Sequence, residues 1–311
     1  MNTLDINALN KRFGAPGRIV FRNDETGLPV VALANQYGTC ELSLYGGHVL
    51  SYRPTGHMPV LFMSKQSLFQ IGKPIRGGIP VCWPWFGPHP ADPAQPLHGF
   101  ARTTTWGLVT TEYSANVTEV CLALADTEET RALWPHRFEL TLRVRLDENL
   151  NLELTTLNRD HQPITFTQAF HPYLRVRHIS DITVDGLENA PYLNRLNQHR
   201  ATQTGKLNIR AETDRVYTPH TPECHLHDPG IGRNVTLVFA GAKQLVVWNP
   251  WIDKARAMPD FADDDYTRMI CLEPANTGDG AVTLSPGEKH ALSFTLRSEE
   301  HTSELQSRQV I

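Results

Sequence analysis

The chain is poor in cysteine and has no motif that would pair its cysteines. Five cysteines are scattered through 311 residues, and no two show the C-x-x-C spacing of a zinc ribbon. Their odd number and wide spacing also argue against a disulfide framework. Because free thiols persist in a reducing compartment, we expect a cytoplasmic protein.

The chain also lacks the segments that direct proteins to membranes. Its opening, MNTLDINALNKRFG, has neither the basic start nor the apolar stretch of a signal peptide. No segment approaches the apolar length that spans a bilayer. We therefore expect no membrane partner.

Positive charge is not in surplus. The formal net charge is -4, whereas a protein that binds phosphate backbones needs excess Lys and Arg on one face. We expect no nucleic-acid partner, and any anion site must be local. A hydrophobic fraction of 40% and a charged fraction of 20% describe a globular protein with ample core.

Several catalytic signatures are missing. The sequence has no G-x-G-x-x-G after a strand, no phosphate loop ending in Gly-Lys-Ser or Gly-Lys-Thr, no G-x-S-x-G and no H-E-x-x-H. Its 14 histidines are dispersed without paired ligand spacing, so we expect no metal site. Acid–base chemistry by histidine and carboxylates, without a cofactor, is the remaining class.

Short strand-like segments dominate the pattern. Residues 138–146 and 150–157 alternate apolar and polar side chains around a turn, which predicts a hairpin. Helical spacing occurs only at residues 5–13, 126–134 and 254–261, and residues 186–227 are mostly irregular. We expect an all-β sandwich formed by residues 1–296 as a single domain.

The end of the chain does not continue this pattern. Residues 297–311 begin RSEEHTSELQS, which resembles the in-frame translation of a sequencing-library adapter. We expect these residues to form a non-native or disordered tail, and they get no functional role.

The stretch that interrupts the strands, residues 74–102, reads PIRGGIPVCWPWFGPHPADPAQPLHGFAR. Its Gly, Pro and Trp content predicts a long ordered loop. Arg76, His98 and Arg102 lie near its ends, where two guanidinium groups and an imidazole suit an anion site. Alternatively, the tryptophans form a small core and the arginines cap loop carbonyls.

Three further residues are candidates for acid–base chemistry. His171 lies between Phe170 and Pro172, in an apolar surround that would hold an imidazole near its protonation balance. Glu273 ends an apolar strand, where desolvation would raise its pKa. Asp214 is the third. Each residue also has a structural alternative. His171 could bond a core carbonyl, Glu273 could cap the turn after its strand, and Asp214 could pair with Arg215.

The motifs PIRGGIPVCWPWFG, HGFAR, FHPYL, TDRVY, VVWNPW and CLEPAN occur in this order. This succession resembles the D-hexose-6-phosphate mutarotases, also called glucose-6-phosphate 1-epimerases, a branch of the aldose 1-epimerase superfamily. The resemblance covers about residues 18–296. It implies a galactose-mutarotase-like β-sandwich that interconverts the anomers of a hexose 6-phosphate, and we expect a monomer.

The resemblance also implies roles for residues. The catalytic histidine and glutamate of the family match His171 and Glu273. The substrate-binding residues match Arg76, Arg102 and Asp214. Some relatives carry a substrate-contacting Gln before H-G-F-A-R, whereas this chain has Leu97, and His98 is a candidate to supply the missing hydrogen bond.

Three alternative functions would use some of the same residues. An aldose 1-epimerase acting on free sugars would share the acid–base pair but not need Arg76 and Arg102. A glycoside hydrolase would use Glu273 and Asp214 as its two carboxylates. A non-catalytic sugar-phosphate sensor would bind without accelerating mutarotation.

Overall fold

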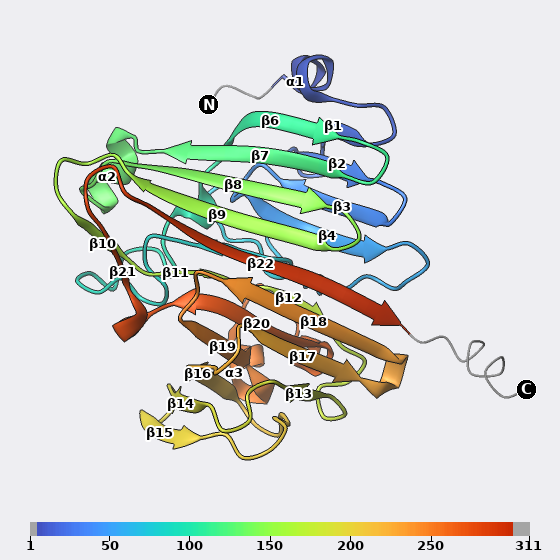
Figure 1. Cartoon of the computed structure of the whole chain (residues 1–311), viewed down its shortest axis with the longest axis vertical. Helices are drawn as coiled ribbons and strands as arrows, with labels where there is room; N and C mark the ends of the chain where they lie inside the picture. Colours follow the sequence, from blue (N-terminus) through green and yellow to red (C-terminus); the bar gives the residue numbers. More distant parts are fainter. Residues whose placement is uncertain (1–4, 301–311) are drawn as a thin grey trace, which may run out of the picture.

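The computed structural model describes residues 5–300, and β-strands dominate it, which confirms the all-β class (Figure 1). Two eight-stranded sheets are accompanied by a four-stranded and a two-stranded sheet. Among the described residues, no helix is long and apolar enough to cross a membrane.

The first eight-stranded sheet, here called the long sheet, crosses the whole molecule in Figure 1. Its strands, in spatial order, are β13 (Thr183–Asp185), β17 (Glu223–Asp228), β18 (Arg233–Ala240), β22 (Lys289–Glu300), β9 (Leu150–Asn158), β8 (Phe138–Leu146), β7 (Thr118–Ala125) and β6 (Gly107–Tyr113). The predicted hairpin is β8–β9, with Leu146 opposite Leu150.

The second eight-stranded sheet, here called the site sheet, carries the candidate catalytic residues. Its path is β15 (His199–Thr202), β14 (Pro191–Asn194), β16 (Thr213–Tyr217), β19 (Gln244–Asn249), β20 (Met269–Asn276), β11 (Gln168–Phe170) and β5 (Val81–Cys82), and β12 (Tyr173–Arg175) also pairs with β20.

The smaller sheets flank these two. The four-stranded sheet has the order β1 (Ile19–Asn23), β2 (Pro29–Ala34), β3 (Gly38–Ser43) and β4 (His48–Pro54), and the two-stranded sheet pairs β10 (Ile164–Phe166) with β21 (Val282–Leu284). The helices are α1 (Ile6–Phe13), α2 (Glu128–Leu133) and α3 (Trp251–Ala257), close to the three predicted segments.

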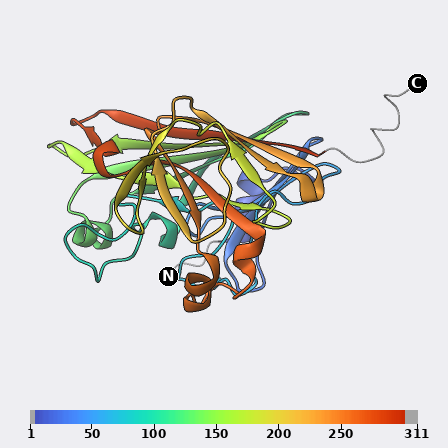
Figure 2. The ribbon, with the colours of Figure 1, turned by 90° about the horizontal axis from the view of Figure 1, so that it is seen from below.

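The main core lies between the long sheet and the site sheet. Phe170 of β11 packs against Phe294 of β22, with ring centroids 5.1 Å apart. Figure 2 shows the long sheet on one side of the molecule and α3 on the other. The site sheet therefore has one face in the core and one face turned toward α3.

The prediction that residues 186–227 are mostly irregular misses the strands that this segment contributes. It contains β14, β15, β16 and most of β17, and the exposed strand β15 shows no apolar alternation that a sequence pattern could reveal. Strand β22 runs past residue 296 to Glu300, which pairs with buried Arg233 of β18. Residues 301–311 of the predicted tail lie outside the described residues.

Candidate active site

A cavity of about 540 Å³ lies on the face of the site sheet that is turned away from the long sheet. Its lining combines basic, acidic, imidazole and apolar side chains. They are Arg76, Phe86, Gly87, Pro88, Leu97, His98, His171, Arg195, Asp214, Val246, Trp248, Lys254, Met258 and Glu273. All predicted site residues except Arg102 are in this set.

Strand alternation selects which residues of β20 reach the cavity. Leu272 belongs to the main core, so its neighbour Glu273 projects from the opposite face of the sheet. Glu273 is nevertheless only 1% exposed. The carboxylate therefore sits at the buried floor of the cavity rather than capping a turn at the surface.

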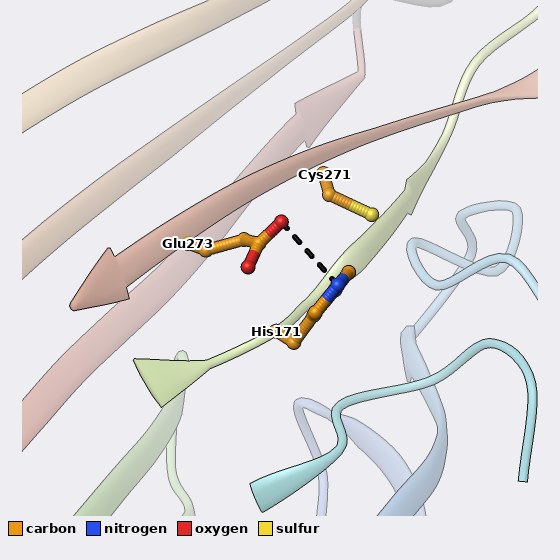
Figure 3. A group of neighbouring side chains, drawn as sticks. All are labelled: His171, Cys271 and Glu273. Atoms are coloured by element: carbon orange, nitrogen blue, oxygen red, sulfur yellow. Dashed lines mark ion pairs between the residues drawn. The ribbon is translucent and has the colours of Figure 1, made fainter. Parts of the chain in front are cut away.

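The break at His171 and Pro172 places the imidazole against this carboxylate. Tyr173 pairs with Cys271, and Ala169 pairs with Ala275, so the antiparallel register puts His171 opposite Glu273. His171 Nε2 lies 3.4 Å from Glu273 Oε1 (Figure 3). The proline interrupts the ladder at the point where the histidine side chain turns toward the cavity.

Aromatic rings hold the imidazole of His171 in place. It stacks on the Tyr173 ring, with centroids 4.9 Å apart and planes at 11°, and meets Trp248 edge-on. Its Nδ1 atom has no hydrogen-bond partner among residues 5–300. The alternative in which this histidine bonds a core carbonyl is therefore wrong.

The two groups have opposite pKa shifts. Burial, and then the positive charges of Arg102 and Arg76, lower the pKa of His171 well below its usual value. Burial, and then the negative charge of Asp214, raise the pKa of Glu273 well above its usual value. Both shifts favour the uncharged form of each group, so the one proton that the pair shares in the empty site is favoured on Glu273.

Asp214 projects from β16 into the cavity. Arg195 Nη1 is 4.0 Å from its Oδ1 atom. Arg215 instead lies over the Tyr192 ring, 4.9 Å from the centroid, and donates to the Tyr217 hydroxyl. The predicted alternative of an Asp214–Arg215 pair is therefore wrong, because neighbouring residues of a strand point to opposite faces.

Arg76 is fixed from two sides. Its Nε and Nη2 atoms each lie 3.1 Å from Asp260 Oδ2, and its Nη1 donates to the Tyr173 hydroxyl at 3.1 Å. The Tyr173 ring in turn stacks on His171. Arg76 is thus rigidly placed in the cavity wall, one side chain away from the acid–base pair.

Arg102 lies behind the cavity wall. It is 7% exposed, and its Nη2 donates to the Leu97 carbonyl at 2.6 Å, so it caps a loop carbonyl as the alternative predicted. Its Nε atom has no partner, and no carboxylate forms an ion pair with it among residues 5–300. A buried cation without a counter-ion is costly, so this position favours an anionic ligand nearby.

His98 presents a donor to the cavity. Its backbone is in the left-handed region (φ 62°), and its Nδ1 accepts a hydrogen bond from the Gly87 N–H at 3.0 Å. In the neutral ring the proton must then sit on Nε2. His98 can therefore donate to a ligand hydroxyl or phosphate oxygen, as Leu97 cannot.

The glycines after Arg76 serve the protein's own packing. A Cβ on Gly78 would lie 2.2 Å from the Val49 carbonyl oxygen, and the residue has a φ of +60°. His48 Nε2 lies 2.8 Å from the Gly77 carbonyl oxygen and holds the loop from the other side. Backbone, rather than a ligand, approaches these glycines.

The tryptophans divide between core and cavity. Trp83 is fully buried and packs edge-on against Phe100 and Trp134, and Trp85 donates to the Pro96 carbonyl. Trp248 lines the cavity, whereas Trp83 and Trp85 belong to the main core.

Sequence reasoning missed two cations of the lining. Arg195 follows β14, lies over the Phe86 ring at 5.2 Å and donates to the Thr277 hydroxyl. Lys254 comes from α3, and its Nζ atom lies 3.3 Å from Glu212 Oε1. Neither belongs to a distinctive motif, so only the folded sheet and helix reveal them.

The chain is similar to known sugar epimerases. A family model described as "Aldose 1-epimerase" matches residues 29–297. A protein of Cenchrus ciliaris, named "Putative glucose-6-phosphate 1-epimerase", is 37% identical over 276 residues, which are 85% of this chain and 83% of that protein. A protein of Salmonella typhimurium with the same name is 30% identical over 272 residues, which are 85% of this chain and 90% of that protein.

Solved structures agree with the sequence relatives. The crystal structure of a "putative mutarotase" from Salmonella typhimurium superposes with a TM-score of 0.86 at 27% identity, covering 95% of this chain and 99% of that one. A galactose mutarotase-like protein from Lactobacillus casei shares the fold, with a TM-score of 0.69 at 17% identity and coverage of 87% and 100%. With the family model spanning most of its length, the chain belongs to the aldose 1-epimerase family.

Proposed function

We propose that this protein interconverts the α and β anomers of hexose 6-phosphates, with glucose 6-phosphate as the expected substrate. The observation that carries the proposal is the His171–Glu273 pair, 3.4 Å apart in a sugar-sized cavity. The names of the relatives support the substrate class. The reaction needs no metal or organic cofactor.

Ring opening requires one base and one acid. Glu273 removes the proton from the C1 hydroxyl while His171 protonates the ring oxygen, which gives an aldehyde. Rotation about C1–C2 exposes the other carbonyl face, and the C5 hydroxyl closes on it as the two groups exchange roles. Each group thus acts in both protonation states, and the pair carries one proton throughout.

The phosphate has two roles in this proposal. It supplies the counter-ion that buried Arg102 lacks, and with Arg76 it fixes the ring in register for proton transfer. It also offsets the two positive charges that lower the pKa of His171. Binding a dianion therefore makes His171 a more competent proton carrier.

The sugar itself meets the remaining polar groups. Asp214 and His98 line the same cavity and suit hydroxyl recognition, and Trp248 offers an apolar wall beneath the ring. We include a cytoplasmic, monomeric protein in the proposal. The five cysteines, all buried and unpaired, support the cytoplasmic location.

The test is the exchange rate between the anomers of glucose 6-phosphate, followed by NMR exchange, with free glucose measured in parallel. We expect strong acceleration for the phosphate ester. Replacement of Arg76 by Met should raise KM for the ester by at least about tenfold, the effect of one charge-assisted hydrogen bond. Replacement of Arg102, which lies behind the cavity wall, removes a nearby positive charge and should raise KM by a smaller factor.

The outcome that contradicts the proposal is equal acceleration of both sugars by the unaltered protein and by the arginine variants. That result would favour an aldose 1-epimerase acting on free sugars. Binding of glucose 6-phosphate without any acceleration would instead favour the sensor.

A further inference from the structure

The acid–base pair has a third neighbour that the proposed reaction does not use. Ligand atoms of His171, Cys271 and Glu273 all lie within 4.8 Å of one another, and all three residues are buried (Figure 3). An imidazole, a thiolate and a carboxylate are the three protein ligand types that Zn²⁺ accepts.

The fold itself creates this group. Cys271 and Glu273 are two residues apart on β20 and therefore share a face of the strand. The register that pairs Tyr173 with Cys271 brings His171 to the same place from the β11–β12 segment. Cys271 and Glu273 thus come from β20, and His171 comes from the two-residue break between β11 and β12, both of which pair with β20.

The distances suit one tetrahedral ion. Zinc bonds of about 2.0–2.3 Å place neighbouring ligand atoms about 3.4–3.7 Å apart. His171 Nε2 and Glu273 Oε1 are 3.4 Å apart, and Cys271 Sγ needs a shift of no more than about 1 Å. His171 and Glu273 line the cavity, so an ion could reach them from there, whereas Cys271 lies behind the lining.

Unused polar atoms also point to a ligand. Glu273 Oε2, on a side chain 1% exposed, has no hydrogen-bond partner among the described residues. A buried carboxylate with an unpaired oxygen destabilises the folded protein, and a divalent cation bound to that oxygen would offset this cost in free energy. No basic side chain forms an ion pair with Glu273 within residues 5–300, so nothing but His171 competes with the metal.

We propose that Zn²⁺ binds to His171, Cys271 and Glu273 from the cavity and, in doing so, inhibits the enzyme. The ion would occupy the lone pairs of Nε2 and Oε1 through which the pair exchanges protons with the sugar. The inhibitory part of this inference depends on the proposed function. The binding part does not.

The expected affinity is moderate. Nδ1 of His171 has no hydrogen-bond acceptor among the described residues, and the loss of such a supporting bond typically weakens zinc binding about 10–100-fold. Cys271 must also release its proton, and burial raises the pKa of its thiol. Binding should therefore strengthen as the pH rises.

Cadmium and zinc titrations of the full chain test the inference. Cd²⁺ bound to Cys271 should produce the thiolate-to-metal charge-transfer band in the ultraviolet, and excess Zn²⁺ should reduce the band by competing for the same site. Cys271→Ser should abolish the band and weaken Zn²⁺ binding, measured by calorimetry, at least tenfold. His171→Ala should weaken it similarly. Cys224→Ser, a fully buried cysteine on β17, is the matched control and should leave both readouts unchanged.

A second measurement uses only the unaltered protein. With free Zn²⁺ fixed by a metal buffer, glucose 6-phosphate should compete with the ion and raise its apparent Kd. Absence of the charge-transfer band, its persistence in Cys271→Ser, or zinc binding that glucose 6-phosphate does not affect would each overturn the inference.

The two proposals fail separately. If mutarotation is catalysed but no metal binds, the zinc site is wrong and the proposed function stands. If Cd²⁺ binds through Cys271 but mutarotation is not catalysed, the metal site is supported and the proposed enzymatic function is wrong.

Discussion

His171 and Glu273 occupy opposite register positions on two antiparallel segments, and their facing atoms are 3.4 Å apart. Burial lowers the pKa of the imidazole and raises that of the carboxyl. In the empty site the proton of the pair therefore favours Glu273, and a bound dianion that offsets Arg102 and Arg76 would favour its transfer to His171, the acid of the proposed ring opening.

The first prediction concerns pH dependence. As pH falls through the lowered pKa of His171, both groups become protonated and the base is lost. As pH rises through the raised pKa of Glu273, both lose their protons and the acid is lost. We expect kcat/KM for glucose 6-phosphate, which reports the groups of the free enzyme, to form a broad plateau after subtraction of the uncatalysed rate. A narrow bell bounded by the usual pKa values of glutamate and histidine would contradict it.

The second prediction concerns the catalytic groups themselves. His171→Ala and Glu273→Gln should each lower kcat about 10²–10⁴-fold, because each removes one positioned acid or base. NMR exchange of glucose 6-phosphate measures the effect. Exposed His161→Ala and Glu25→Gln are matched controls and should retain full activity. Comparable losses in the controls would assign the effect to folding.

The third prediction links activity to stability. The folded-state pKa of Glu273 is raised, so its contribution to stability is greatest below the unfolded pKa and falls as pH rises toward the folded value. Glu273→Gln removes this penalty. At pH about 7 the variant should therefore be more stable than the unaltered protein, and its Tm should be higher.

The control for this prediction is pH itself. Thermal unfolding of both proteins at pH about 4, below the ordinary glutamate pKa, should show a smaller difference. A constant Tm difference at all pH values would attribute the effect to packing instead of ionisation.

The fourth prediction concerns the phosphate. Arg102 and Arg76 lower the pKa of His171, so an inorganic dianion that offsets their charge should activate the enzyme toward a sugar that has no phosphate. We expect phosphite to raise kcat/KM for free glucose in the unaltered protein. Arg102→Met should lose the activation. Inhibition of free-glucose turnover by phosphite would show that the anion occupies the sugar site.

The fifth prediction concerns the end of the described chain. Arg233 is 1% exposed and binds the Pro59 and Met58 carbonyls as well as Glu300. Glu300→Gln leaves this buried guanidinium without its carboxylate and should lower the free energy of unfolding by about 3–5 kcal/mol. A chain that ends at Glu300 should match the full chain in denaturant unfolding. Equal stability of Glu300→Gln would show that the pair contributes little.

Sequence patterns predicted the features that depend on local periodicity. Alternation defined the β8–β9 hairpin, and helical spacing located the segments of α1, α2 and α3. Strand β15 was missed because its residues are mostly exposed and follow no apolar alternation.

The site was predictable only where residues lie in distinctive motifs. Arg195 and Lys254 reach the cavity from a strand end and a helix, and no sequence spacing reveals that they meet. The proximity of Cys271 to His171 likewise depends on the pairing of β12 with β20. Pairing between distant strands is a property of the whole fold, which local patterns do not encode.

The proposed acid–base pair and the residues proposed to bind the phosphate belong to parts of the chain that can change independently. Glu273 is fixed within a central strand, between β19 on one side and β11 and β12 on the other. Arg76, His98 and Arg102 lie on the irregular segment 74–102, which tolerates substitution more readily than a central strand. Evolution can therefore retune sugar preference in that segment while the proton-transfer geometry is inherited intact, which makes the fold a ready source of epimerases with new substrates.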